Sequence, residues 1–275
     1  MPRAQGSTTV TIRRLSGAGA MEVCADLVAT EEPLEIRVAG RSVAVVMRTP
    51  GHDRELAAGF LVTEGVLRRP DQVLDMVYCR AGGEPEENVL DVLLAPGAAV
   101  DFDRLTRHVF TSSSCGICSK ASIAAIRAQF PAIASHSAPR RAVLASLPEA
   151  LRAAQAGFDR TGGLHASALF TAEGVLINAR EDVGRHNALD KVVGRAFLDG
   201  ALPLAERILL VSGRVSFELM QKALGAGIPI VAAISAPSSA AVAFAQASGQ
   251  TLVGFLRPDG TGGMRMNVYA GTVAD

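Results

Sequence analysis

The alternation of short apolar runs with helical segments between Ile208 and Phe255 constrains the fold more than any other feature of this chain. Such alternation predicts a parallel sheet with helices on both faces, and therefore an α/β domain in the carboxyl part of the chain. The expected order of elements is a strand at Ile208–Val211, a helix at Ser216–Leu224, a strand at Ile228–Ile234, a helix at Ser238–Ala247 and a strand at Thr251–Phe255.

The same region contains a long stretch without charge. No charged residue occurs between Ala223 and Leu256, which raises the question of a membrane span. Gly225, Gly227, Pro229 and a serine-rich cluster at 235–239 interrupt the stretch. These breaks predict a buried sheet and its connections, with no span.

Three loops should meet at one edge of this sheet, because ligands of such sheets bind beyond the carboxyl ends of the strands. Ser238 and Ser239 open a helix whose free N–H groups can hold a phosphate, and Arg214 and Arg257 add forked cationic donors. Turn and cap chemistry explains any one loop equally well. Together they predict an anion or nucleotide site. The loops are Ser212-Gly213-Arg214, Ser235 to Ser239, and Phe255-Leu256-Arg257-Pro258-Asp259-Gly260.

The amino-terminal part of the chain has strand-like patterning. Residues Thr8 to Met47 are expected to form strands with a hairpin turn at Ala39-Gly40, and a helix follows the stop at 50–53. The pattern predicts a small α+β domain. Further expected elements are strands at Val73–Cys79 and Val89–Leu94, a connector at 131–142, a helix at Pro148–Phe158, a hairpin formed by His165–Phe170 and Val175–Asn178, and a helix at Arg185–Phe197. The expected domains are 1–104, 105–158 for the cysteine loop with its connecting helices, and 159–275.

A pair of cysteines, Cys115 and Cys118, stands in a polar loop with Gly116 between them. Ile123, Ile126 and Phe130 recur at near-helical spacing, so a helix should begin just after the second cysteine. Free N–H groups and the positive end of the helix dipole would stabilise a thiolate there, which is the nucleophilic form of cysteine.

Three interpretations compete for this Cys-x-x-Cys pair. A closed zinc site needs four ligands, and Cys24 and Cys79 stand alone in apolar surroundings. A zinc deaminase needs His-x-Glu ahead of its cysteines, whereas His165-Ala166-Ser167 follows them and has no glutamate. What remains is thiol chemistry, either dithiol–disulfide exchange or carriage of a sulfur atom as a persulfide.

Composition narrows the class of protein further. Lys plus Arg and Asp plus Glu are both 27, so no general nucleic-acid surface is expected. The segment Met1 to Leu15 holds no apolar run of signal-peptide length. We therefore expect a cytoplasmic protein, in which a thiol pair is more often reactive than a structural disulfide.

One dense polar segment has no clear assignment from sequence. Six of the twelve residues from Arg180 to Lys191 are charged, against 20% of the chain, and they could form the solvated face and caps of the helix that follows. A lone histidine such as His165 or His186 is ordinarily a hydrogen-bonded structural residue. Neither has metal-ligand spacing with the cysteines.

Several strings, in order and over nearly the whole chain, resemble the formate dehydrogenase accessory sulfurtransferases of the FdhD/NarQ family. One departure is Ser119, where the family has glycine after the second cysteine. The strings are Arg48-Thr49-Pro50-Gly51, Glu55 to Leu61, Thr63-Glu64-Gly65, Cys115 to Cys118, Thr161 to Ala166, Glu181 to Lys191, and Thr251 to Phe255.

The resemblance implies a function that spacing alone does not. Such proteins accept persulfide sulfur from a cysteine desulfurase and transfer it to the molybdenum cofactor, bis-molybdopterin guanine dinucleotide, for formate dehydrogenase. By position, Cys115 matches the persulfide-carrying cysteine, Cys118 its partner, and Phe255 to Gly260 the cofactor-binding segment. The resemblance also implies a cytidine-deaminase-like α/β/α domain without its zinc site, and a homodimer. A cofactor-binding chaperone with structural or redox cysteines is the alternative.

Overall fold

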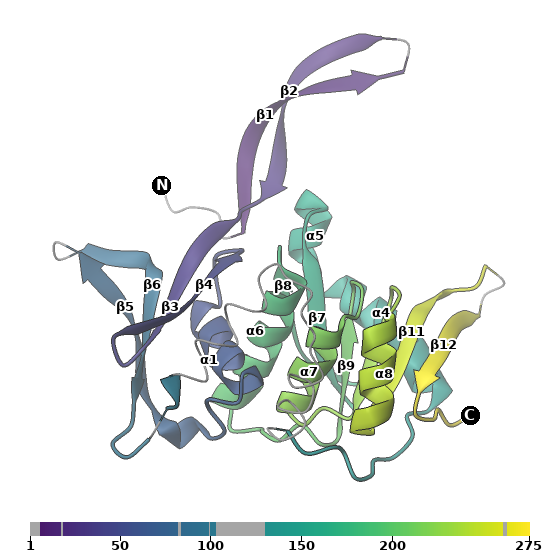
Figure 1. Ribbon diagram of the computed structural model, residues 1–275. Coiled ribbons are helices and arrows are strands. Elements are labelled where there is room, and N and C mark those ends of the chain that lie inside the picture. Colours follow the sequence, from purple (N-terminus) through teal and green to yellow (C-terminus); the bar gives the residue numbers. More distant parts are fainter. Residues whose placement is uncertain (1–5, 18, 82–83, 99, 103–129, 261–262) are drawn as a thin grey trace.

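The computed structural model describes residues 6–17, 19–81, 84–98, 100–102, 130–260 and 263–275, and these residues form three β-sheets (Figure 1). The largest has six strands in the order β12-β11-β10-β9-β7-β8. Its strands β9, β10 and β11 run parallel, while β8, β7 and β12 join as antiparallel neighbours. The predicted parallel core is confirmed. The strand bounds are β7 (His165–Thr171), β8 (Leu176–Asp182), β9 (Arg207–Val211), β10 (Ile230–Ala233), β11 (Thr251–Pro258) and β12 (Met264–Ala270).

Helices cover both faces of this sheet. One hydrophobic cluster joins α4 to strand residues such as Phe170 and Ile208, and a second joins the other helices to Leu169 and Leu209. Neighbouring residues of a strand point to opposite faces, so the two clusters lie on opposite sides. This arrangement confirms the α/β class. The helices are α4 (Arg141–Ala153) on one face and α6 (Arg185–Leu198), α7 (Phe217–Gly225) and α8 (Ser239–Ser248) on the other (Figure 1).

The charge-free stretch accounts for the centre of the sheet. Its residues form β10, α8 and most of β11, and Val231, Ala232 and Val253 are fully buried. No helix in the described part of the chain is long and apolar enough to cross a membrane.

Two expected boundaries are wrong. Strand β11 continues to Pro258 instead of ending at Phe255, because β12 pairs with it antiparallel. The helix expected from Pro148 begins at Arg141, inside the expected connector, and Pro148 lies within it; a separate short helix, α5 (Ala156–Thr161), follows. The stripe of Val143, Leu144, Leu147 and Leu151 is buried against the sheet, and this packing outweighs the helix-breaking tendency of proline.

The amino-terminal part folds into the other two sheets. Strands β3 (Glu32–Val38), β4 (Arg41–Arg48), β5 (Val73–Ala81) and β6 (Glu84–Leu94) form a sheet in the order β4-β3-β6-β5. Helix α1 (Asp53–Thr63) lies between this sheet and α6 (Figure 1). A single hydrophobic cluster includes residues of β3, β6, α1 and α6, so the two parts of the chain share one core.

Strands β1 (Ser7–Ser16) and β2 (Ala20–Ala29) form an arm that projects from the body of the molecule (Figure 1). In its register Leu15 is opposite Met21, and Val23 and Leu27 lie on the same face of the arm. All four side chains are exposed. On this face the β2 side chains form an apolar row in contact with solvent, and β1 contributes Leu15 together with the polar residues Thr9, Thr11 and Arg13.

Helices α1 and α6 approach each other at two glycines. A Cβ atom on Gly59 would overlap the backbone carbonyl of Asp190, and one on Gly194 would overlap that of Glu55. Only glycine allows the backbones to come this close.

The polar segment from Arg180 to Lys191 is not a solvated face, contrary to one expectation. The ammonium of Lys191 is buried 2.7 Å from the Asp182 carboxylate and donates to the backbone oxygen of Thr49. Asp182 also accepts hydrogen bonds from the Asn187 amide and the Thr49 N–H. The segment is therefore a buried polar network that holds α6 against the end of β4.

Candidate functional site at the carboxyl edge of the sheet

The three loops expected at the sheet edge do come together. The loop after β10 bonds to the loop after β9, since Val215 N–H donates to Ala236 O (3.1 Å) and Ser238 N–H donates to Val215 O (2.9 Å). On its other side it accepts a 3.1 Å hydrogen bond at Ser235 O from the N–H of Phe255. Backbone contacts thus hold the loops in fixed relation to one another.

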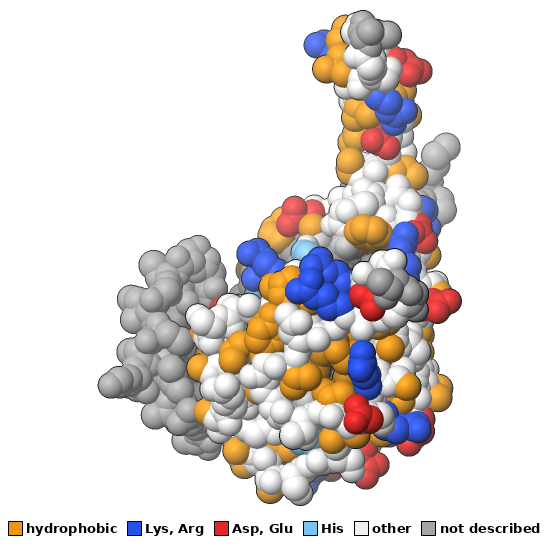
Figure 2. All heavy atoms as spheres, turned by 90° about the vertical axis from the view of Figure 1, so that its right-hand side faces the viewer, with side chains coloured by type: hydrophobic (Ala, Val, Ile, Leu, Met, Phe, Trp, Pro, Cys, Tyr) orange, Lys and Arg blue, Asp and Glu red, His pale blue; other side chains and the backbone are white. Residues whose placement is uncertain are grey.

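Phe255 is the centre of a cationic surface on the β11–β12 hairpin. Its backbone has a positive φ of 53°, which is unusual for a bulky residue. The guanidinium of Arg257 lies 5.0 Å from the centre of its ring, and that of Arg265 lies 5.8 Å from it. Figure 2 shows Lys and Arg side chains gathered beside this hairpin. Arg265 was not among the predicted site residues, because no strand was predicted at Met264–Ala270.

The other residues of Phe255–Gly260 have different environments. Leu256 is fully buried in the core under α4, so its side chain is not exposed to a ligand. Pro258, Asp259 and Gly260 are exposed near the hairpin turn. There the Asp259 carboxylate accepts the N–H of Gly263 at 3.0 Å, which stabilises the turn.

Of the two serines at the start of α8, Ser238 has a structural role. The Ser238 hydroxyl accepts the N–H of Ala241 at 3.2 Å and so caps the helix. Ser239, the first helical residue, is exposed at the same end. Helices α6, α7 and α8 all begin at this edge, because each follows a strand that ends there. Their positive dipole ends add to the cationic character of the edge.

Two histidines that sequence analysis treated as structural also lie here. His165 begins β7, and a Cβ on Gly213 would be only 3.1 Å from its Nδ1. Burial and the charges of Arg185, Arg214 and His186 lower the pKa of His165, while Asp182 opposes the shift. His186 pairs with Glu218 at 3.0 Å, and this hydrogen bond lowers the pKa of that carboxyl. One feature of the sequence indicated this position: His165 lies at the start of an expected strand, and His186 lies at the start of an expected helix.

The two thiols, Cys115 and Cys118, lie outside the described residues, so their predicted roles stay predictions. Cys24 lies on β2 and Cys79 on β5, as their strand-like surroundings indicated. Both are partly exposed free cysteines.

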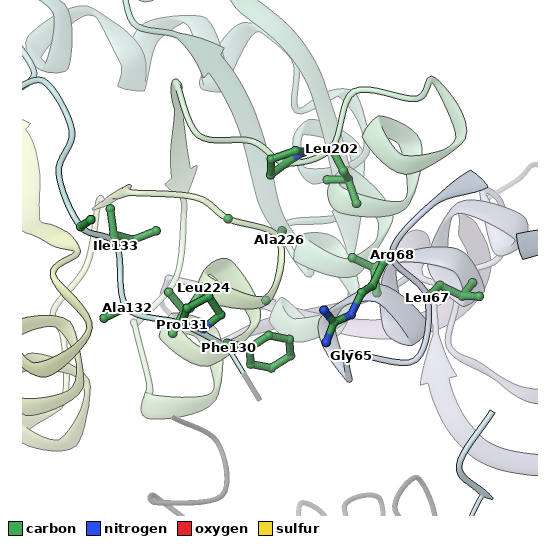
Figure 3. A pocket seen from close by; sticks show the side chains of 15 residues that line it. Gly65, Leu67, Arg68, Phe130, Pro131, Ala132, Ile133, Leu202, Leu224 and Ala226 are labelled. Atoms are coloured by element: carbon green, nitrogen blue, oxygen red, sulfur yellow. The ribbon is translucent and has the colours of Figure 1, made fainter. Parts of the chain in front are cut away.

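A cavity lies at the carboxyl-terminal end of α7, at the end of this helix that faces away from the carboxyl edge of the sheet (Figure 3). This cavity of about 410 Å³ is lined mainly by apolar side chains, among them Phe130, Leu202 and Leu224, together with Arg68. Binding sites for polar ligands need several convergent polar groups. The carboxyl edge of the sheet has such groups and this cavity has few.

Comparison with known proteins assigns the chain to a family. Residues 29–274 match the model of the FdhD/NarQ family. A protein of Streptomyces avermitilis named sulfur carrier protein FdhD is 56% identical, with 92% of this chain and 90% of the relative covered. One of the same name from Mycolicibacterium paratuberculosis is 53% identical, with 87% and 88% covered.

A solved structure has the same fold. The crystal structure of a Desulfotalea psychrophila protein assigned as a formate dehydrogenase accessory protein superposes with a TM-score of 0.74 at 24% identity, with 97% of each chain covered. That match shows the fold, and the family model together with the relatives at 53% and 56% identity shows that the protein belongs to the FdhD/NarQ family.

Proposed function

We propose that this protein is a sulfur carrier that accepts persulfide sulfur from a cysteine desulfurase on Cys115. It then transfers the sulfur to the molybdenum cofactor, bis-molybdopterin guanine dinucleotide, which formate dehydrogenase requires. Membership of the FdhD/NarQ family and relatives named sulfur carrier protein support the sulfur-carrying part. The observation that supports a nucleotide cargo is the cationic sheet edge around Phe255, Arg257 and Arg265.

The loading step follows from cysteine chemistry. The Cys115 thiolate attacks the terminal sulfur of the desulfurase persulfide, so that a new S–S bond forms on Cys115 while the donor S–S bond breaks. The desulfurase cysteine leaves as a thiolate. On delivery an electron pair of the acceptor atom of the cofactor forms the new bond to the terminal sulfur, the S–S bond on Cys115 breaks, and Cys115 leaves as a thiolate.

The donors at the sheet edge suit the cargo. A guanine dinucleotide carries pyrophosphate groups, and exposed arginines with forked donors bind such oxyanions in bidentate fashion. Three helix N-termini supply further N–H groups. The Phe255 ring adds an aromatic surface beside these donors, with the guanidinium groups of Arg257 and Arg265 at 5.0 Å and 5.8 Å from its centre.

The loading step is tested by incubating the protein with a cysteine desulfurase and cysteine, followed by peptide mass spectrometry. One added sulfur atom on Cys115, absent from Cys115→Ala, is the expected result. Cys24 and Cys79 are internal controls, because both are partly exposed thiols. Added sulfur on those two alone would contradict the assignment. Cys118→Ala shows whether the second thiol is required for loading.

A chaperone function is the second candidate. The three loops and the arginines of the cationic edge contain no cysteine, so the chain could bind and deliver the cofactor while its cysteines serve a structural or redox purpose. In that case Cys115→Ala would support full formate dehydrogenase activity. A dithiol oxidoreductase would instead show a reversible Cys115–Cys118 disulfide and would reduce insulin.

We further propose that the protein acts in the cytoplasm as a homodimer. The exposed apolar face of the β1–β2 arm supports an interface, since contiguous apolar surface of this kind favours association. Val23→Lys places a second cation directly opposite Arg13 in the middle of that face. Sedimentation of the wild type as a dimer and of this variant as a monomer is expected.

A further inference from the structure

The cavity at the carboxyl-terminal end of α7 has walls that backbone hydrogen bonds hold in place. It lies between the ends of α1 and α7, the connector that precedes α4 and the loop that precedes β9 (Figure 3). The connector is fixed because Ile133 N–H donates to Ser248 O at 2.8 Å, and the loop is fixed because Leu204 N–H donates to Ala226 O at 3.0 Å. The described walls are therefore preformed, as they are in most small-molecule sites.

The walls are largely apolar. Val62, Leu67, Phe130 and Leu224 belong to the main hydrophobic cluster and are themselves buried. The Phe130 ring lies close against Gly225, where a Cβ atom would be 3.1 Å from the ring. The volume of about 410 Å³ falls in the range of roughly 300–1,000 Å³ that is usual for ligand sites, whose walls are mostly apolar with a few polar groups.

One cation, Arg68, lies at this cavity. Figure 3 shows its side chain extending toward Phe130. Arg68 is exposed and forms no ion pair with a described carboxylate, whereas the adjacent Arg69 pairs with Asp71 at 3.1 Å. Its forked donors are therefore available to an acceptor on a ligand.

The nearby helix ends do not make the cavity a cation site. The carboxyl end of a helix carries partial negative charge, which favours cations. At the end of α1 the N–H of Gly65 donates to Val62 O at 2.9 Å, and at the end of α7 the N–H of Gly227 donates to Leu224 O at 2.8 Å. These carbonyl groups already have partners, so the guanidinium of Arg68 is the group that is left for a charged ligand.

We infer that this cavity binds a small apolar molecule that carries one carboxylate. The apolar body fills the space between Phe130 and Leu224, and the carboxylate accepts hydrogen bonds from the guanidinium of Arg68. Burial of apolar surface supplies most of the affinity, and Arg68 selects the charge. The site lies at the end of α7 away from the cationic edge of the sheet, so it is separate from the proposed cofactor surface and depends on neither thiol.

Calorimetric titration of the purified full chain with three matched probes tests the choice of charge. Phenylbutyrate, phenylbutanol and phenylbutylamine share an apolar body and carry a carboxylate, a hydroxyl and an ammonium group. Phenylbutyrate should bind most tightly, the alcohol roughly 10-fold more weakly and the amine most weakly, because Arg68 repels it. The absence of saturable phenylbutyrate binding, or an amine that binds at least as tightly, would overturn the inference.

Arg68→Met tests the cation directly. The change keeps an unbranched apolar chain and removes the guanidinium, so it should abolish the roughly 10-fold preference for phenylbutyrate over phenylbutanol. Arg69→Met is the matched control, because Arg69 is adjacent, exposed and paired with Asp71. A preference that survives in Arg68→Met, or one that disappears equally in both variants, would contradict the assignment.

A change of volume locates the apolar body of the ligand. Ala132 lines the cavity from the exposed connector, so Ala132→Phe places a ring in the space and should weaken phenylbutyrate and phenylbutanol alike by roughly 10-fold or more. Ser135→Phe adds the same ring to the same connector outside the cavity and should leave both affinities unchanged. Melting curves show that both variants are folded. Unchanged binding by folded Ala132→Phe would place the ligand elsewhere and refute the inference.

The cationic edge of the sheet is the competing site for a carboxylate. Arg257→Met removes a cation from that edge and should leave the affinity for phenylbutyrate unchanged, and saturating pyrophosphate should not displace phenylbutyrate from the wild type. A loss of affinity in Arg257→Met as large as that in Arg68→Met, or displacement by pyrophosphate, would move the ligand to the edge and overturn the inference.

Discussion

The charged side chains in the interface between α1 and α6 are paired with one another, whereas several arginines at the carboxyl edge of the sheet are not. In the interface Lys191 pairs with Asp182 at 2.7 Å, Arg180 pairs with Glu55, and Lys222 pairs with Asp190 at 2.9 Å. At the edge, Arg185, Arg214, Arg257 and Arg265 form no direct ion pair with a described carboxylate, although the charge of Arg185 contributes to the lowered pKa of Glu218, the partner of His186. Paired buried charges position elements, whereas unpaired cations beside helix N-termini leave an anion to be supplied from outside.

The interface is strongly coupled electrostatically. Burial alone would lower the pKa of Lys222, but the charges of Asp190 and Glu64 raise it above its usual value. On the far side of α1, burial and the negative charge of Asp53 together raise the pKa of Tyr78 to about 12. Each group depends on its partner, so removal of one partner should cost far more in the interface than at the edge.

The largest effect is expected for Lys191→Met. This change leaves the Asp182 carboxylate buried and without its cation, which should lower the free energy of unfolding by about 3–5 kcal/mol. Urea denaturation measures it. Arg195→Met on the same helix is the control, because Arg195 forms an exposed pair with Asp199 and its removal should change the free energy of unfolding very little. Similar losses in both variants would contradict the comparison.

The Glu55–Arg180 pair predicts acid sensitivity. Burial raises the pKa of Glu55, but hydrogen bonds from Arg180 and His52 outweigh it and lower the pKa from 4.5 to about 2. Because the folded-state pKa is depressed, the stabilisation is present above pH 4.5 and is lost as the pH falls toward 2. Its size is on the order of 3 kcal/mol. Urea denaturation at a series of pH values gives the free energy of unfolding. Between pH 4.5 and 2 this free energy should fall more steeply with falling pH in the wild type than in Glu55→Gln. Equal slopes in the two proteins would contradict the pairing.

Gly194→Ala tests the close approach of the two helices. Alanine is the better helix former by about 1 kcal/mol, so the change would stabilise an isolated helix. In the protein its Cβ overlaps the carbonyl of Glu55, and the helices must separate at a net cost of about 1–3 kcal/mol. Denaturant titration decides the sign. A gain in stability would show that α1 and α6 are not packed this closely.

The smallest effect on stability is expected at the cationic edge. Arg257→Met removes an exposed side chain and should change the free energy of unfolding by less than about 0.5 kcal/mol. The same change should weaken GDP binding by about 1.5–3 kcal/mol if the guanidinium contacts a phosphate. Calorimetry and denaturation on one preparation report both quantities. A stability loss that matches the binding loss would place Arg257 with the structural charges.

Local pattern was sufficient for much of the fold. The parallel strands β9, β10 and β11 are uniformly apolar and short, and the helices between them have buried stripes and serine caps, so type and order were predictable. Strand β12 was not, since half of its residues are polar or exposed and its pairing with β11 is non-local. The position of Arg265 and the true end of β11 depend on that pairing.

The sequence by itself determined the α/β alternation, the convergence of three loops at one sheet edge and the presence of a thiol pair. Those features follow from periodicity and from local turn and cap chemistry, which act over a few residues. Only the tertiary structure decided that Asp182, Asn187 and Lys191 are buried against Thr49, while the buried Nε of Arg185 has no acceptor among the described residues. Partners more than a hundred residues apart set the difference, and no local pattern contains that information.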